Sequence, residues 1–400
     1  MDIFDKCYAF EDAKAVRQRG LYPYFRPIQE NRGSTVVMDG RELIMLGSNN
    51  YLGLSYDPRV KEASIRAVEQ YGTSCSGSRF LNGTLALHEE LEHRLATFVG
   101  KQAVLVFSTG YQCNLGAISA LVSSRDHVLV DRYNHASIMD GLFLASGLVK
   151  KSMNYIRYRH NDMADLERKL QRIDHAHPKL IISDGVFSME GDIARLPQMA
   201  ELAKRYNARI YLDDAHAIGV IGQNGKGTEE HFGGKHQADV LMCTFSKSFG
   251  SLGGFVAGDH DVIDYIRHMA RSLIFSASMP PAAAAAVLKA LEIMEQEPQH
   301  VRRVQELGER MRQMLSGMGF DIGESETPIV PILVRDTERT FVFWKALFEN
   351  GVYTNPVLSP AVPSDRTLLR TSYMAIHELE ELERAAEIMR RVGKQVGVLP

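Results

Sequence analysis

Apolar residues along much of the chain fall into short β-rich runs that are separated by longer helical patterns. Between about residues 60 and 270, most of the intervening stretches have helical spacing, as at 162–173 and 196–206. Strands joined by helices are typical of a mainly parallel sheet that is covered on both faces. We therefore predict a large α/β domain with strands at 103–107, 127–130, 154–158, 179–183, 209–213, 239–243 and 254–258.

The two ends of the chain have different patterns. Residues 1–20 predict an amphipathic helix ended by Gly20, and prolines make 21–28 an extended arm. Met38-Asp-Gly-Arg41 predicts a hairpin-like turn. Beyond residue 300 helices and strands mix, which indicates a smaller α+β domain. The predicted parts are an N-terminal helix and arm (1–55), a large α/β domain (56–296) and a small C-terminal domain (297–400), with an alanine-rich helix at 282–297 expected to link domains.

Composition limits the classes to which the protein can belong. With 400 residues, 45% of them hydrophobic and 24% charged, the chain is typical of a soluble globular protein with two or three domains. The net charge of -3 gives no overall attraction to nucleic acid or to an anionic membrane. The start of the chain lacks a signal-peptide pattern and the four cysteines form no CxxC pair, so we expect a cytoplasmic protein with reduced thiols and no metal site.

The strand predicted at 239–243 leads to a lysine at the sheet edge where α/β proteins bind ligands. Thr244, Ser246 and Lys247 follow this strand directly, and a glycine-rich turn comes next. A partly desolvated amine can form a Schiff base with a carbonyl group, while hydroxyl groups can hold a phosphate. The alternative is a solvated lysine in a surface turn, and other parts of the chain must decide between the two.

Two further strand ends suit an aromatic ligand that carries a phosphate. Ser108-Thr-Gly-Tyr-Gln-Cys-Asn114 opens a helix whose free N–H groups can bind a phosphate, and Gly110 allows the anion to approach. Asp213 can keep a heteroaromatic ring nitrogen protonated, as pyridoxal phosphate (PLP) chemistry requires, and His216 could contact the ring oxygen. Serine and glycine are nevertheless common in such turns, and paired aspartates often cap helices.

Three more residues complete the candidate site. His135 follows the strand at 127–130 and could stack on a planar ring or transfer a proton, although a lone histidine is more often structural. Ser188, in the loop 184–191, could donate to a cofactor oxygen. Arg370 is a charge within an apolar strand, and a buried guanidinium needs a carboxylate from the protein or from a substrate. Taken together, these strand ends favour a PLP site.

Five stretches carry a resemblance to a known family: Ser-Asn-Asn-Tyr-Leu-Gly-Leu (48–54), Asn-His-Ala-Ser (134–137), Asp-Gly-Val-Phe-Ser-Met-Glu-Gly-Asp (184–192), Asp-Asp-Ala-His (213–216) and Thr-Phe-Ser-Lys-Ser (244–248). They resemble the α-oxoamine synthases, fold-type-I PLP-dependent transferases that condense an amino acid with an acyl-CoA and release CO2. The similarity runs from about Gly20 to the last helix. It implies a large mainly parallel-sheet domain, a smaller C-terminal α+β domain and a homodimer with shared active sites.

Four other stretches resemble the branch of this family that uses L-serine and a long-chain acyl-CoA: 24–28, 77–84, 275–279 and 355–363. The resemblance implies that Lys247 bonds the cofactor and later removes the α-proton, Asp213 pairs with the pyridine nitrogen and His135 stacks on the ring. His216 and Ser188 would lie near the phenolic oxygen. The implied phosphate ligands are Gly110, Tyr111, Thr244, Ser246 and Ser276 of the partner subunit, and the implied substrate contacts are Arg370 and Asn49, with Tyr71 and the acyl-CoA contact Arg26.

Several alternatives stay open on the sequence. The same chemistry could use glycine with acetyl-CoA, alanine with a pimeloyl thioester or a short-chain acyl donor, because one or two pocket residues change selectivity. A PLP-dependent aminotransferase would instead give a keto acid without release of CoA. An inactive partner subunit of a heterodimeric synthase is a third class, against which the retention of Lys247, Asp213 and His135 argues. An acyl-CoA substrate and a lipid product would also allow peripheral contact with a membrane.

Overall fold

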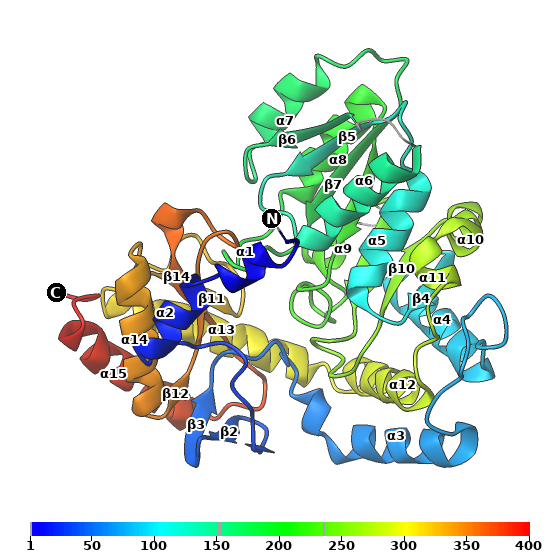
Figure 1. Ribbon diagram of the computed structural model, residues 1–400. Helices are drawn as coiled ribbons and strands as arrows, with labels where there is room; N and C mark the ends of the chain where they lie inside the picture. The colour runs from blue at the N-terminus through cyan, green and yellow to red at the C-terminus, as the bar shows by residue number, and fades with distance from the viewer. Residues whose placement is uncertain (1, 150–153, 235–236) are drawn as a thin grey trace. The chain divides into compact units, whose positions relative to one another are not determined.

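Two compact units make up the chain in the computed structural model, which describes residues 2–149, 154–234 and 237–400 (Figure 1). The larger unit comprises Asn49–Glu306 and Glu326–Pro328. The smaller unit combines the residues up to Ser48 with Leu307–Ser325 and Ile329–Pro400. The three-part division expected at residues 55 and 296 stays a prediction.

A seven-stranded sheet forms the centre of the larger unit, with the strand order β4-β10-β9-β8-β7-β5-β6. Neighbours from β9 to β6 pair in parallel, whereas β10 is antiparallel to both β4 and β9. The predicted fold class is therefore confirmed, and each predicted strand is present within one residue of its expected bounds. The strands are β4 (Ala103–Phe107), β5 (His127–Asp131), β6 (Asn154–Tyr158), β7 (Lys179–Asp184), β8 (Arg209–Asp213), β9 (Val240–Thr244) and β10 (Gly254–Gly258).

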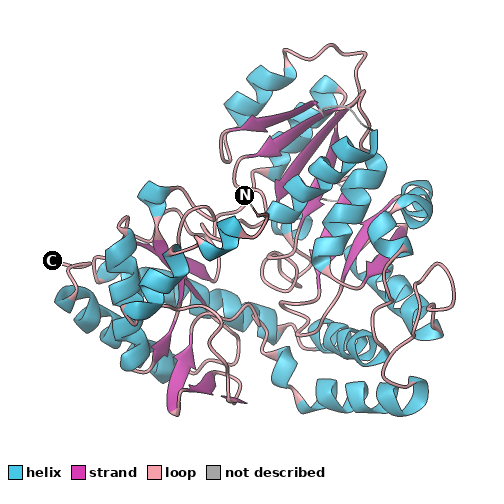
Figure 2. Ribbon diagram, viewed as in Figure 1, coloured by secondary structure: helices cyan, strands magenta, loops and turns pink. Residues whose placement is uncertain are grey.

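Helices cover both faces of this sheet (Figure 2). Apolar side chains of α5 and α6, such as Ile118 and Leu142, are buried against those of the strands, such as Val130 and Tyr211. The apolar runs form strands because both of their faces are buried in this way. The helices of the larger unit are α3 (Pro58–Tyr71), α4 (Ala86–Val99), α5 (Gly110–Leu121), α6 (Ala136–Val149), α7 (Met163–Leu170), α8 (Leu196–Tyr206), α9 (Thr228–His231), α10 (His260–Met269), α11 (Arg271–Ile274) and α12 (Pro281–Gln296).

The alanine-rich helix α12 does not link the two units, contrary to the prediction. It lies within the larger unit and packs along α3, because its small side chains, Ala284 and Ala290 among them, allow close approach and are buried. The chain passes into the smaller unit one helix later, within α13 (Gln299–Gly317).

The smaller unit contains two small sheets and three longer helices. One sheet has the order β1-β2-β3-β12 and the other the order β11-β14-β13. Asp39 and Gly40 both have positive φ, 50° and 70°, between the antiparallel strands β2 and β3, which confirms the predicted turn. The elements are β1 (Glu30–Asn31), β2 (Thr35–Met38), β3 (Arg41–Met45), β11 (Ile329–Leu333), β12 (Val352–Tyr353), β13 (Asn355–Val357), β14 (Leu368–Ser372), α13, α14 (Thr337–Glu349) and α15 (Leu379–Gln395).

The helix predicted for residues 1–20 is wrong in one respect, because the described residues form two short helices, α1 (Asp5–Tyr8) and α2 (Asp12–Gln18). Neither helix has a buried residue, and Phe4, Tyr8 and Phe10 are exposed. A short helix that buries no apolar face gains little from tertiary packing, so packing does not favour one continuous helix here. Among the helices that the structure describes, none is both long and apolar enough to cross a membrane.

Candidate active site

A cavity of about 270 Å³ lies at the carboxyl edge of the large sheet. Its lining comes from the ends of β7, β8 and β9 and from the loops that follow β4 and β5. Ligands bind at this edge in open α/β sheets because the loops that follow parallel strands converge there. The sequence-predicted residues that line the cavity are Gly110, Tyr111, His135, Asp213, His216, Thr244, Ser246 and Lys247.

The first turn of α5 forms one wall of the cavity. Thr109 caps the helix by accepting a hydrogen bond from the backbone N–H of Gln112 at 3.1 Å. Gly110 packs so closely on Thr244 that an added Cβ would lie 2.6 Å from the Thr244 Cβ and Oγ1. The hydroxyl groups of Thr244, at the end of β9, and of Ser246, in the loop that follows, are 2.9 Å apart. Helix N–H groups and two hydroxyl groups together suit a phosphate.

Lys247 lies in the loop between β9 and β10, half-buried and facing the cavity. Phe245 and Phe249 are fully buried on either side of it, with their rings in edge contact at 5.3 Å. Gly250 has a φ of 62° and sits so close to Ser55 that a Cβ there would lie 2.4 Å from the Ser55 nitrogen. The loop is thus fixed by packing, and it presents the lysine from a rigid base.

The two neighbouring aspartates at the end of β8 have separate tasks. Asp213 lines the cavity, and its carboxylate accepts hydrogen bonds from the Asn114 amide at 2.7 Å and the Ala215 N–H at 3.0 Å. Asp214 is fully buried and accepts from the backbone and hydroxyl group of Thr228. Burial raises the pKa of Asp214 to about 7, although these hydrogen bonds oppose the shift. Of the two aspartates at the end of β8, Asp213 is therefore the one that can contact a ligand in the cavity.

A chain of hydrogen bonds runs from β8 to His135. The Tyr211 hydroxyl donates to Asn114 Oδ1 at 2.9 Å, and the Asn114 amide donates to Ser137 Oγ at 2.9 Å as well as to Asp213. Ser137 Oγ lies 2.7 Å from His135 Nδ1, which also receives the Ser137 backbone N–H at 3.3 Å. A nitrogen that accepts a backbone N–H carries no proton itself. The contacts therefore select a neutral His135 with its proton on Nε2.

Electrostatics agrees with a neutral His135. Burial lowers the pKa of His135 most, and the positive charge of Lys247 adds to this effect, whereas Asp213 opposes it. Asp184 lies beside Asp213 in the register of β7 and β8 and also lines the cavity. Burial and the charge of Asp213 raise the pKa of the Asp184 carboxyl well above its ordinary value.

His216 is held from the segment that precedes α3. Its Nδ1 lies 2.8 Å from the hydroxyl group of Tyr51, which is fully buried. The same hydroxyl donates to Asn49 Oδ1 at 3.4 Å. The contact connects Asn49, a predicted substrate residue, to the cavity wall.

Other predicted residues lie outside the lining of this cavity. Ser188 is in the loop after β7, and Ser276 accepts a hydrogen bond from Gln112 at 3.0 Å next to the start of α5. Tyr71 ends α3 and lines a different depression, together with Arg59. Roles for these residues stay predictions.

Two predicted arginines belong to the smaller unit. Arg26 pairs with Asp39, and its guanidinium lies 4.5 Å from the ring centre of Phe348. Arg370 is only 4% exposed and contacts Ser372 Oγ at 3.4 Å. Their predicted contacts with substrates stay predictions.

Four residues that organise the site were not predicted as site residues: Tyr51, Asn114, Ser137 and Asp184. Each nevertheless lies inside a motif that the sequence had already singled out, at 48–54, 108–114, 134–137 or 184–192. Their position inside these motifs is the sequence signal from which the four residues could have been predicted.

These residues fit PLP as a ligand. The start of α5 with Thr244 and Ser246 suits its phosphate, Asp213 suits its ring nitrogen, and Lys247 opens into the same cavity. Gly110 lets the start of α5 pack directly against Thr244, which brings the helix N–H groups and this hydroxyl group together. Within the part of the chain that the structure describes, no group of three His, Cys, Asp or Glu could hold a metal ion.

The fold and this site define a PLP-dependent enzyme of the transferase type, and the chain belongs to the family described as aminotransferase class I and II, whose model matches residues 41–389. Within that family its relatives are α-oxoamine synthases, as predicted. The chain is 51% identical to a serine palmitoyltransferase of Sphingobacterium spiritivorum over 389 residues, covering 97% of this chain and 96% of that protein. It is 42% identical to an 8-amino-7-oxononanoate synthase of Symbiobacterium thermophilum, covering 98% of this chain and 99% of the other.

A solved structure agrees with this assignment. The serine palmitoyltransferase of S. paucimobilis with a bound PLP–myriocin aldimine superposes with a TM-score of 0.94 at 34% identity, covering 100% of both chains. The similarity therefore extends over the whole chain rather than over the PLP domain alone.

Proposed function

We propose that this protein is a serine palmitoyltransferase that uses PLP. It joins the α-carbon of L-serine to the carbonyl carbon of a long-chain acyl-CoA, the carbon–sulfur bond breaks, and CoA leaves. The serine carboxylate then departs as CO2, and the product is 3-ketosphinganine. The observation that carries the proposal is a near full-length identity of 51% to a serine palmitoyltransferase, together with a cavity that unites Lys247, Asp213 and His135.

The residues of the cavity divide the work of the reaction. Bound PLP supplies an electron sink for the carbanion that forms at the α-carbon. The Asp213 carboxylate would keep the pyridine nitrogen protonated, and the N–H groups of α5 with Thr244 and Ser246 would hold the phosphate. Lys247 would hold the cofactor in the resting enzyme, and its Nζ would be the base that takes the α-proton of serine.

His135 contributes orientation and a single hydrogen-bond donor. Ser137 and Asn114 hold Nδ1 as an acceptor, so the Nε2–H remains as the donor of the ring. A neutral imidazole can lie against the cofactor ring without placing a second positive charge beside the protonated pyridine. Because burial and Lys247 keep its pKa low, His135 stays neutral at physiological pH.

We also propose a homodimer in which Ser276 of the partner subunit assists the phosphate site, in line with the family resemblance. Arg370 and Asn49 are proposed to bind serine, with Tyr71 and Arg26 as further substrate contacts, and the cytoplasm is the proposed location. Size-exclusion chromatography with light scattering tests the dimer. Loss of PLP affinity in Ser276→Ala would support the shared phosphate site, and an unchanged affinity would contradict it.

CoA release tests the function directly. The purified, PLP-loaded protein is assayed with serine, glycine and alanine, each paired with palmitoyl-CoA, acetyl-CoA and a pimeloyl thioester. Release confined to serine with palmitoyl-CoA is the expected result. Release with alanine and the pimeloyl thioester would assign the second candidate, 8-amino-7-oxononanoate synthesis, which the relative at 42% identity favours. No release with any pair would overturn the acyltransferase assignment.

A further inference from the structure

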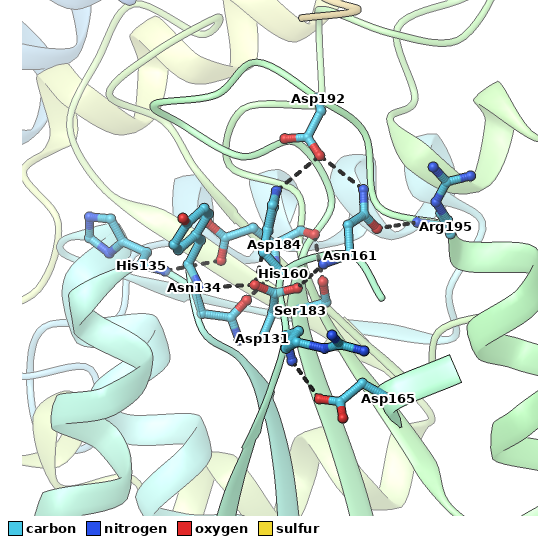
Figure 3. Close-up of polar contacts among 12 residues, drawn as sticks. Asp131, Asn134, His135, His160, Asn161, Asp165, Ser183, Asp184, Asp192 and Arg195 are labelled. Carbon is cyan, nitrogen blue, oxygen red and sulfur yellow. Dashed lines mark hydrogen bonds and ion pairs between the residues drawn. The ribbon is translucent and has the colours of Figure 1, made fainter. Parts of the chain in front are cut away.

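A histidine outside the cavity joins three loops at the carboxyl edge of the sheet (Figure 3). His160 follows β6, and its Nδ1 lies 3.0 Å from an oxygen of Asp131, the last residue of β5. Its Nε2 lies 3.1 Å from an oxygen of Asp192, in the loop after β7. Both carboxylates are buried, with exposures of 2% and 6%. One imidazole therefore bridges the segments that follow β5 and β7.

The bridge requires a charged imidazole. Carboxylate oxygens accept hydrogen bonds and cannot donate them when ionised, so both ring nitrogens of His160 must carry protons. Burial alone would lower the pKa of His160, but the hydrogen bonds and charges of Asp131 and Asp192 raise it to about 10. Two aromatic rings also hold the imidazole. It stacks on the Tyr133 ring and contacts the Phe187 ring edge-on, with a distance of 4.4 Å between ring centres in each case.

Asp131 fixes the start of the loop that carries His135. Its Oδ1 accepts the backbone N–H of Tyr133 at 2.9 Å, and its Oδ2 accepts that of Asn161 at 2.7 Å. Asn161 in turn donates its side-chain amide to Asp192 Oδ2 at 2.9 Å. The two carboxylates and His160 thus form one connected cluster with the backbone of two loops.

The same loop meets the cavity through the next two residues. Asn134 donates to the carbonyl oxygen of Ile182 at 2.8 Å and accepts the Asp184 N–H at 3.1 Å. The backbone N–H of His135 donates to Asp184 Oδ1 at 3.2 Å. Figure 3 shows His135 and Asp184 on one side of this network and Asp192 with Asn161 on the other. A shift of the cluster would therefore move His135 relative to Asp184.

We propose that His160, as an imidazolium clamped between Asp131 and Asp192, is a positioning residue that sets the place of His135 in the active site. It touches neither the cavity nor a reacting atom, and it acts through the loop 131–135. The proposal adds a residue to the reaction proposed above, and its catalytic consequence rests on that function. Its structural consequence does not, because the cluster is built from this chain alone.

His160→Gln removes the charge and leaves a side chain that can reach only one of the two carboxylates. In the protein without PLP, hydrogen exchange measured by mass spectrometry should become at least about 10-fold faster at residues 133–135, since hydrogen bonds to charged groups contribute about 1.5–3 kcal/mol. Amides in the centre of β8 should keep their wild-type exchange. In the PLP-loaded enzyme, kcat/KM for serine should fall about 10- to 100-fold, mainly through kcat.

His175→Gln is the matched control. His175 also stacks on a tyrosine, Tyr206, but it is exposed in the loop that precedes β7, at the opposite edge of the sheet. This variant should match the wild type in both measurements. If wild-type protein releases no CoA at all, the proposed function fails, while the exchange result still decides the role of His160.

Asp192→Asn covers the case in which His160→Gln does not fold, because it keeps the pair of His160 with Asp131. It should show the same local increase in exchange to a smaller extent. Wild-type exchange at residues 133–135 in a folded variant would overturn the proposal. A uniform increase across the whole sheet, in step with lower global stability, would equally overturn it, because it would mean that His160 only stabilises the fold.

Discussion

Asn114 offers the sharpest test of the hydrogen-bond chain that links Asp213 to His135. Asn114→Leu keeps a side chain of similar size and removes both N–H donors and the acceptor. It deletes the bonds to Asp213 at 2.7 Å, to Ser137 at 2.9 Å and from Tyr211 at 2.9 Å. Of the two hydrogen bonds described for the Asp213 carboxylate, only the one from the Ala215 N–H remains. His135 loses the constraint that directs the Ser137 proton toward its Nδ1.

The magnitude follows from the character of the three bonds. The bond to the charged Asp213 is worth about 1.5–3 kcal/mol and each neutral bond about 0.5–1.5 kcal/mol. Burial of the leucine side chain offsets part of the loss, so the free energy of unfolding should fall by about 2–4 kcal/mol. That loss leaves a typical domain folded. A carboxylate that is free to turn away from the pyridine nitrogen should lower kcat/KM about 10- to 100-fold.

The measurements are chemical unfolding, the dissociation constant of PLP and CoA release from serine and palmitoyl-CoA. Tyr211→Phe is the control, because it removes only the neutral bond at the far end of the chain and leaves both donors of Asn114 in place. It should cost about 1 kcal/mol of stability and leave kcat/KM within about 3-fold of the wild type. Equal catalytic losses in the two variants would refute the reasoning, since the bond to Asp213 would then have no special weight.

Three other outcomes are expected. Lys247→Ala should abolish CoA release while PLP still binds through the phosphate site, measured by equilibrium dialysis; appreciable turnover would contradict the role of this lysine. Gly110→Ala places a carbon 2.6 Å from Thr244, so PLP affinity should fall about 10-fold, whereas Gly147→Ala, where the added carbon meets nothing within 4 Å, should leave it unchanged. The folded pKa of His160, about 10, lies above the ordinary 6.5, so its ion pairs stabilise fully below about pH 6.5 and this stability is lost as the pH rises toward 10. The stability difference between wild type and His160→Gln in urea unfolding should therefore shrink over that range, and a constant difference would argue against a charged His160.

The fold was largely predictable because burial alone determines its main elements. The runs at 103–107 and 209–213 are buried strands with the expected bounds, and the helix expected at 196–206 is α8. The antiparallel direction of β10 was not predicted, although the nine residues between β9 and β10 are too few for a crossover helix. The first 20 residues differ from the prediction, because an amphipathic pattern indicates a helix but does not show whether another part of the protein packs against it.

The site was predictable to the extent that chemistry fixes residue types. Lys247, Asp213 and His135 stand at strand ends where a PLP enzyme needs an amine, a carboxylate and a stacking ring. Their supports depend on packing between distant segments: Asn114 and Asp213 are 99 residues apart, and Tyr51 and His216 are 165 apart. No local pattern encodes such pairs. His160 was not predicted for the same reason, because its role depends on its contacts with both Asp131 and Asp192.

The combination of both chain ends in the smaller unit affects the order in which the protein can fold. Strand β3 pairs with β2 on one edge and in parallel with β12 on the other, so its second edge has a partner only after residues 352–353 have been synthesised. The larger unit, from Asn49 to Glu306, is nearly continuous and can gather its contacts while translation proceeds. The N-terminal segment must therefore wait for the C-terminal part of the chain with one edge of β3 unpaired. We expect the nascent chain to depend on chaperones most during this interval.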